Sequence, residues 1–122
     1  MKPSKKILII EDEKTLARAL ELTLTRAGFA VTTVFNGEEG TILLQNESFE
    51  LILLDLIMPK MDGFAVLTAL KEQGIKTKVM ILSNLSQESD LKRTKEFDVK
   101  EFFIKSNTPI ATIVEQVRKL LK

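Results

Sequence analysis

Short apolar runs recur along the chain, and longer segments of mixed polarity separate them. Four runs are apolar at nearly every position and a fifth is mixed: 7–10, 51–54, 79–82, 101–104 and 30–35. Apolar residues at successive positions, not alternate ones, are typical of strands covered on both faces, as in a parallel sheet. The pattern therefore predicts five strands in a sheet with helices on both sides.

The segments between the runs have the spacing of amphipathic helices. In the first, Leu16, Leu20, Leu24 and Ala27 share one face, and Gly28 follows where a left-handed residue commonly ends a helix. The remaining helices are predicted at about 38–46, 64–74, 86–97 and 110–121.

The ends of the last two helices carry more specific signals. Thr108 is the predicted N-cap of the last helix, with Pro109 as its first residue. Ser86 is the predicted N-cap of the fourth helix, whose apolar face consists only of Leu91 and Phe97. We expect this fourth helix to be the least firmly docked of the five.

Five strands alternating with five helices indicate an α/β fold, a (βα)5 chain in one domain over residues 1–122. Right-handed crossovers make this a doubly wound, five-stranded parallel sheet of order 2-1-3-4-5. Ligands of such folds bind beyond the carboxyl ends of the strands, where the first and third strands lie side by side. The domain either stands alone or belongs to a longer chain.

The composition excludes several classes of function. The chain has 18 Lys+Arg against 17 Asp+Glu, so it has no general bias toward nucleic acid, and we expect no direct nucleic-acid binding. It contains no Cys and no His, which excludes thiolate chemistry, His-based zinc sites and Ser-His-Asp catalysis. The run at 7–10 is too short for a signal-peptide core or a membrane span. We expect a cytoplasmic protein without membrane insertion.

Acidic residues stand where two of the buried strands end. Asp55 directly follows 51–54, and Glu11 and Asp12 directly follow 7–10. A carboxylate at the tip of an apolar strand is costly unless a cation, a hydrogen bond or exposure compensates it. Three carboxylates in one crevice repel one another, so either one is protonated or a cation binds.

Oxygen ligands without sulfur or imidazole favour Mg²⁺. A carboxylate beside Mg²⁺ can attack phosphorus and form an aspartyl phosphate. Ser83 ends the fourth predicted strand and Lys105 ends the fifth, so a hydroxyl and an ammonium group for phosphoryl oxygens come to the same edge.

Four segments together resemble the receiver domain of bacterial two-component response regulators, of the chemotaxis-regulator type. They are 7–13 (ILIIEDE), 53–63 (LLDLIMPKMDG), 81–83 (ILS) and 103–105 (FIK). The resemblance extends over essentially the whole chain and implies a flavodoxin-like fold. It also implies that Asp55 accepts a phosphoryl group, that Asp12 and Asp55 ligate Mg²⁺, that Glu11 holds it through water, and that the Ile57 carbonyl completes the set.

The same resemblance implies that Ser83 and Lys105 contact the phosphoryl oxygens and that Phe102 is the switch aromatic coupled to Ser83. The donor would be a sensor histidine kinase or a phosphotransfer protein. A downstream output protein or domain would bind the face of the fourth helix, fifth strand and fifth helix. Such a phosphoprotein promotes only its own phosphorylation and dephosphorylation and is expected as a monomer or weak dimer.

Four residues depart from the family's pattern. Asn84 stands where a small residue is common, and it either obstructs the donor or hydrogen-bonds the phosphate. Ser106 replaces a proline that often follows a cis bond, and we predict a trans Lys105–Ser106 bond because a cis bond before serine costs roughly 3–4 kcal/mol. Ile57 and Leu85 flank the site with apolar bulk, which predicts slow self-dephosphorylation.

Three other classes of protein share features with this chain. A pseudo-receiver that only binds partners is disfavoured by the retained Asp12, Asp55 and Lys105. A flavin-binding protein would need a hydroxyl- and glycine-rich phosphate loop where this chain has acids at 11–13. A phosphatase of the haloacid dehalogenase type would need a second acid at Ile57.

Overall fold

The computed structural model describes residues 4–58, 60–84 and 88–122. Five parallel strands form a single sheet of order β2-β1-β3-β4-β5, as predicted. The strands are β1 (Lys6–Ile10), β2 (Ala30–Val34), β3 (Leu51–Leu54), β4 (Lys78–Ser83) and β5 (Val99–Ile104). The helices are α1 (Lys14–Arg26), α2 (Gly37–Asn46), α3 (Gly63–Glu72), α4 (Glu88–Thr94) and α5 (Ile110–Leu120), with a 3₁₀ turn η1 (Lys105–Asn107).

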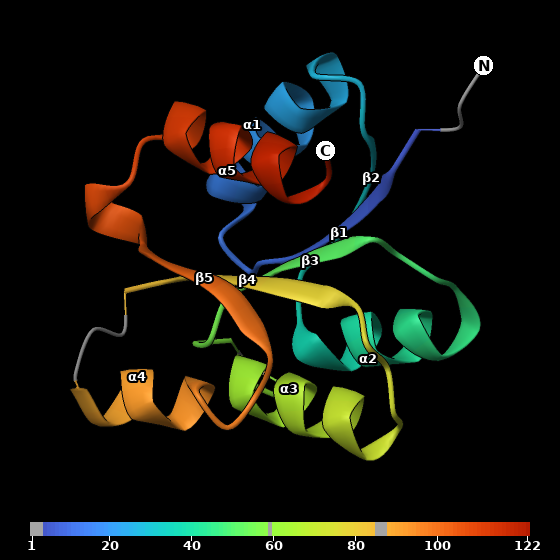
Figure 1. Ribbon diagram of the computed structural model, residues 1–122, viewed down its shortest axis with the longest axis vertical. Coiled ribbons are helices and arrows are strands. Elements are labelled where there is room, and N and C mark those ends of the chain that lie inside the picture. The colour runs from blue at the N-terminus through green and yellow to red at the C-terminus, as the bar shows by residue number, and fades with distance from the viewer. Residues whose placement is uncertain (1–3, 59, 85–87) are drawn as a thin grey trace.

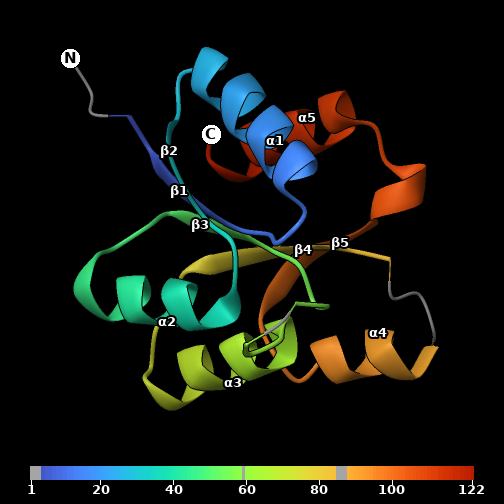
Figure 2. The ribbon, with the colours of Figure 1, turned by 180° about the vertical axis from the view of Figure 1, so that it is seen from behind.

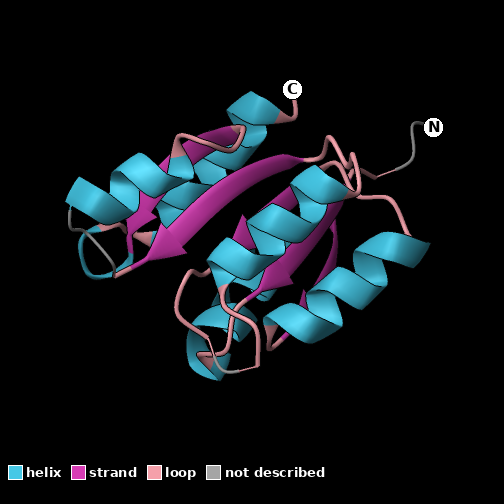
Figure 3. Ribbon diagram, turned by 90° about the horizontal axis from the view of Figure 1, so that it is seen from below, coloured by secondary structure: helices cyan, strands magenta, loops and turns pink. Residues whose placement is uncertain are grey.

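The helices cover both faces of the sheet in three layers. α1 and α5 lie on one side and α2, α3 and α4 on the other, as both views from the side show (Figure 1 and Figure 2). Seen from below, the helices run roughly along the strands, and the carboxyl ends of the strands point to one edge of the sheet (Figure 3). Glu11, Asp55, Ser83 and Lys105 lie at this edge, where β1, β3, β4 and β5 end.

Alternation along each strand divides the core between the two layers. Ile7 and Ile9 of β1 pack in the cluster beneath α1 and α5, whereas Leu8 and Ile10 pack in the cluster of α2 and α3. All four side chains are fully buried. At about 25 cal/mol per Å² of apolar surface, burying such a side chain contributes roughly 1.5–3 kcal/mol. A two-sided core therefore explains why the strand sequences are apolar at every position.

Two of the predicted helix ends were wrong. Pro109, not Thr108, is the N-cap residue of α5, because the Thr108 hydroxyl donates to the Ile104 carbonyl (2.9 Å) and closes the 3₁₀ turn instead. Helix α4 ends at Thr94, not at Phe97, since the Phe97 N–H donates to the Thr94 carbonyl in a turn before β5. The predicted N-cap Ser86 lies outside the described residues.

The cap after α1 is confirmed. Gly28 has φ +101°, a left-handed conformation that costs glycine little.

None of the helices within the described part of the chain is long and apolar enough to cross a membrane.

Candidate functional site: an acidic pocket at the strand ends

The backbone places Glu11 and Asp55 by extending the sheet beyond the assigned strands. The Asp55 N–H donates to the Ile10 carbonyl (3.0 Å), and the Glu11 N–H donates to the Val34 carbonyl (3.1 Å). Both residues are therefore held as if they were the next residues of their strands. Their side chains are almost fully buried, with 2% of Glu11 and 3% of Asp55 exposed.

Lys105 supplies the positive charge that these buried carboxylates need. Its Nζ lies 2.8 Å from Glu11 Oε2 and 2.9 Å from Asp55 Oδ2, and 3.4 Å from Glu13 Oε2. Two of these contacts are short charge-assisted hydrogen bonds, the stronger kind in proteins. One ammonium group at the end of β5 thus joins the acids at the ends of β1 and β3.

Burial and these contacts shift two pKa values. Burial raises the pKa of Glu11 to about 7, against the lowering effect of the Lys105 hydrogen bond, and the neighbouring Asp55 charge adds to the rise. Burial by itself lowers the pKa of Lys105, but its hydrogen bonds to Glu11 and Asp55 outweigh this, so the pKa is raised. Lys105 is therefore a permanent cation at neutral pH, whereas Glu11 is near its titration point.

Three carboxylates fit a hard divalent cation. One oxygen from each of Glu11, Asp12 and Asp55 lies within 4.8 Å of the others. Asp12 is exposed to solvent, while the other two are buried. An all-oxygen set with one open side suits Mg²⁺, which binds one or two carboxylates and keeps several waters.

The loop after Asp55 approaches the site closely. The Ile57 N–H donates to Asp55 Oδ1 (3.1 Å), which orients the carboxylate, and the Asp62 side chain caps α3. A Cβ on Gly63 would lie 2.4 Å from the Asp55 carbonyl oxygen and 2.7 Å from the Leu56 Cα. A side chain at residue 63 would therefore force the backbone at Asp55 and Leu56 to shift.

Comparison with known proteins agrees with this geometry. The family model "Response regulator receiver domain" matches residues 7–118. The chain belongs to the response regulator receiver domain family. The cell cycle response regulator CtrA of Brucella ovis is 36% identical over 100 residues, which are 82% of this chain and 43% of CtrA. The transcriptional regulatory protein DltR of Streptococcus agalactiae is 34% identical over 85 residues, 70% of this chain and 38% of DltR. The matched part therefore spans less than half of either relative.

Solved structures show the same fold. The receiver domain of Francisella response regulator 1452 superposes with a TM-score of 0.88 at 27% identity, covering 96% of both chains. The response regulator TrrA of Thermotoga maritima, solved in complex with Mg²⁺-BeF, has a TM-score of 0.82 at 28% identity, covering 95% of this chain and 98% of TrrA.

In this receiver domain, Ser83 and Phe102 lie on the neighbouring strands β4 and β5, but they are not opposite each other. Ser83 is fully buried at the end of β4, opposite Ile104 of β5. Phe102 lies opposite Ile81 and is partly buried against the α2 and α3 cluster. The structure brings Glu11, Asp55 and Lys105 into direct contact and places Ser83 on the adjoining strand.

Two of the four residues that depart from the family's pattern, Asn84 and Ser106, contact each other. The Ser106 N–H donates to Asn84 Oδ1 (3.0 Å). The Lys105–Ser106 peptide bond is trans, which confirms the prediction. Of the two apolar residues predicted to flank the site, Ile57 is half exposed and Leu85 lies outside the described residues.

Three contacts were not foreseen from sequence. The Glu13 N–H donates to Glu11 Oε2 (2.9 Å), and Glu13 also reaches Lys105. The third contact is the close approach of Gly63 to the Asp55 carbonyl. The signal for Glu13 was present as a third acid in the run 11–13, but its partner is 92 residues away.

Proposed function

We propose that Asp55 of this receiver domain accepts a phosphoryl group from the phosphohistidine of a sensor histidine kinase or phosphotransfer protein. The observation that supports this most is the buried Asp55 carboxylate with a Lys105 ammonium at 2.9 Å and two further acids beside it. The nucleophile, the positive charge and a place for a divalent cation thus share one strand edge. The family, in which the relatives CtrA and DltR are named as regulators, agrees with a signalling role.

The transfer step conserves charge and atoms. An oxygen of the Asp55 carboxylate attacks phosphorus, the P–N bond of the phosphohistidine breaks, and its electron pair stays with the imidazole nitrogen. Lys105 then holds a phosphoryl oxygen in place of a carboxylate, and the Ser83 hydroxyl donates to a second one. The Ile57 N–H keeps Asp55 oriented for attack by holding its other oxygen at 3.1 Å.

Glu11, Asp12 and Asp55, with the Ile57 carbonyl, are the residues that would hold Mg²⁺. When bound, Mg²⁺ supplies neutralising charge at the phosphoryl oxygens. In agreement with this, a relative of the same fold, TrrA, is described in complex with Mg²⁺-BeF.

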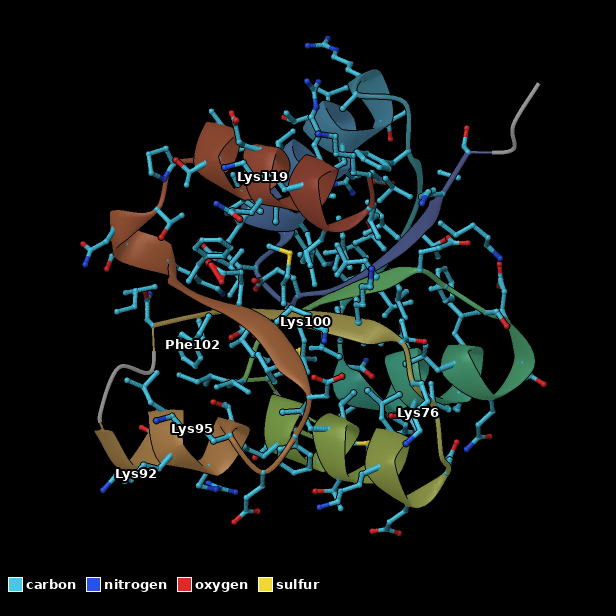
Figure 4. All side chains as sticks on the ribbon, in the orientation of Figure 1. Lys76, Lys92, Lys95, Lys100, Phe102 and Lys119 are labelled. Carbon is cyan, nitrogen blue, oxygen red and sulfur yellow. The ribbon has the colours of Figure 1, made fainter. Side chains whose placement is uncertain are left out.

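Phosphorylation would be read at the face formed by α4, β5 and α5. Figure 4 shows Phe102 on the same side of the molecule as Lys92, Lys95, Lys100 and Lys119. Between α4 and β5 runs a groove of about 570 Å³ whose lining includes Phe102. We propose that Ser83 moves toward the phosphoryl group, that Phe102 follows, and that the groove changes shape for an output protein or domain.

Intact mass after incubation with acetyl phosphate and Mg²⁺ tests the proposal. We expect addition of one phosphoryl group, and we expect its loss in Asp55→Asn and in EDTA. Glu50→Gln is a control, because Glu50 is an exposed carboxylate outside the site. If neither acetyl phosphate nor any histidine kinase adds a phosphoryl group, the domain acts by binding alone and the proposal is wrong.

Amide exchange tests the switch separately. With a beryllofluoride mimic on Asp55, we expect the rates of amide exchange to change in β5 (99–104) and in α4 (88–94). Unchanged exchange in both segments would contradict the switch while leaving phosphorylation intact.

We also expect the phosphoryl group to persist for minutes or longer, because Ile57 is an apolar neighbour that cannot activate water. A half-life of seconds would contradict this.

A further inference from the structure

One hydrogen bond joins two loops at the rim of the acidic pocket. Asn84 Oδ1 accepts from the Ser106 N–H at 3.0 Å, across 22 residues of sequence. Asn84 follows the last residue of β4, and Ser106 is the second residue of the 3₁₀ turn that follows β5. The bond therefore connects the loop after Ser83 to the turn that carries Lys105.

The 3₁₀ turn needs this acceptor. The first N–H groups of a helical turn have no acceptor within it, and Ile104, the N-cap residue of η1, has no side chain that could cap it. The backbone ladder between β4 and β5 ends one step earlier, at the pair Ser83 and Ile104. Asn84 extends it by one bond with a side-chain carbonyl in place of a backbone carbonyl.

A second side chain fixes the other side of the same turn. The Thr108 hydroxyl donates to the Ile104 carbonyl at 2.9 Å. With Asn84 holding Ser106 and Thr108 holding Ile104, the residues on both sides of Lys105 are tied down. The side chain that leaves this short segment reaches Glu11 at 2.8 Å and Asp55 at 2.9 Å.

We propose that Asn84 is a positioning residue for phosphoryl transfer, which acts by holding the Ser106 N–H and so the backbone from which Lys105 reaches Asp55. This inference rests on the function proposed above for Asp55. The chemistry of the pair is mutually dependent. A residue at 84 without a side-chain acceptor would leave the Ser106 N–H without this bond, and a proline at 106 would have no N–H to donate.

The orientation of the Asn84 amide follows from its partner. A backbone N–H can only donate, so the carbonyl end of the amide must face Ser106 and the NH₂ end must face away. The NH₂ end is the only donor of this side chain, so both roles predicted for Asn84, obstructing the donor and hydrogen-bonding the phosphate, stay predictions.

A double-mutant cycle tests the proposal. The variants are Asn84→Ala, which removes the acceptor, and Ser106→Pro, which removes the donor. Ser106→Ala is the matched control, since it keeps the N–H and removes only the exposed hydroxyl. Phosphorylation by acetyl phosphate with Mg²⁺ is followed over a range of donor concentrations, so that the limiting rate is separated from donor affinity.

We expect Asn84→Ala to lower the limiting rate about tenfold with little change in donor affinity. Ser106→Pro should lower it at least as much, partly because proline also restricts the residue before it. In the Ser106→Pro background, Asn84→Ala should have no further effect, and Ser106→Ala should behave as the unmodified chain. Full additivity of the two effects, or an unchanged rate in Asn84→Ala, would overturn the proposal.

The Lys105 ammonium provides a readout that a general loss of stability would not reproduce. In protein labelled with ¹⁵N at the lysine side chains, its signal is identified by its absence in Lys105→Met. We expect this signal to broaden in Asn84→Ala and Ser106→Pro and to persist in Ser106→Ala and in Asn84→Asp, which retains an acceptor oxygen. An unperturbed signal in Asn84→Ala would refute positioning even if the rate fell.

The two proposals fail in different ways. If the unmodified chain takes up no phosphoryl group, the function of Asp55 and the role of Asn84 are both wrong. If the unmodified chain is phosphorylated and Asn84→Ala is phosphorylated equally fast, only the role of Asn84 is wrong.

Discussion

Replacing Lys105 with methionine should raise the affinity for Mg²⁺ while lowering the rate of phosphorylation. Methionine keeps much of the length of the side chain and removes the ammonium group. That group lies 2.8 Å from Glu11 and 2.9 Å from Asp55, two of the three residues whose oxygens can hold a divalent cation. Lys105 and Mg²⁺ therefore compete for the same carboxylates.

The size of the effect follows from the charges. Mg²⁺ binds oxygens at about 2.1 Å, and the ammonium lies 2.8 Å from Glu11 Oε2 and 2.9 Å from Asp55 Oδ2. A cation on these oxygens would therefore be at most about 5 Å from the ammonium. Coulomb's law then gives a repulsion of about 1.7 kcal/mol even with the screening of bulk water. Because 1.4 kcal/mol is a factor of ten, we expect Lys105→Met to bind Mg²⁺ at least about tenfold more tightly.

The rate should change in the opposite direction. Loss of a charged donor to the transferring group typically costs about 10²–10³ in rate. Since the chain has no Trp, Mg²⁺ binding is best followed by titration calorimetry, and phosphorylation by intact mass at saturating Mg²⁺. Lys100→Met is the control, because Lys100 pairs with the exposed Asp98 and lies outside the pocket.

Three results would refute this reasoning. Weaker or unchanged Mg²⁺ binding in Lys105→Met would show that the ammonium does not compete with the cation. An unchanged rate at saturating Mg²⁺ would show that Lys105 gives the phosphoryl group no stabilisation. A similar gain in affinity in Lys100→Met would mean that overall charge, and not the position of Lys105, controls binding.

Three further predictions concern stability. The pKa of Glu11 rises from 4.5 to about 7 on folding, so the folded state binds more protons than the unfolded state between these values, and stability should fall as pH rises through this window. In EDTA, the urea midpoints at pH 5 and pH 8 should therefore differ less in Glu11→Gln than in the unmodified chain. Gly63→Ala should cost about 1–3 kcal/mol and slow phosphorylation, because its Cβ meets the Asp55 carbonyl, whereas Gly74→Ala, in open space at φ +69°, should lose stability without affecting the rate. Asp62→Ala removes the N-cap of α3 and should cost about 1 kcal/mol in urea unfolding, with equal midpoints counting against the cap.

The strands and their order could be predicted from the sequence because the pattern that a buried strand needs is local. A strand covered on both faces must be apolar at every position, and β1 and β3 meet this requirement with the runs 7–10 and 51–54, which contain only Ile and Leu. Alternation with helices then restricts the order of the sheet. The location of the acids followed from the strands, since residues that directly follow parallel strands lie at the same edge of the sheet.

Helix boundaries were less predictable because competing acceptors decide them. Thr108 has the composition of an N-cap, but its hydroxyl bonds to the Ile104 carbonyl in the preceding turn. Nothing near Thr108 in sequence shows that this carbonyl needs a donor. The start of α5 therefore depends on how β5 ends.

The sequence by itself determined that carboxylates, a hydroxyl and a lysine collect at one edge of a parallel sheet, because strand register and burial follow from local patterns. Only the tertiary structure decided how these groups pair. Lys105 bridges Glu11 and Asp55 from 94 and 50 residues away, and Asn84 meets the Ser106 N–H. Such contacts depend on side-chain directions at the ends of different strands, and these directions are set by packing and not by sequence spacing.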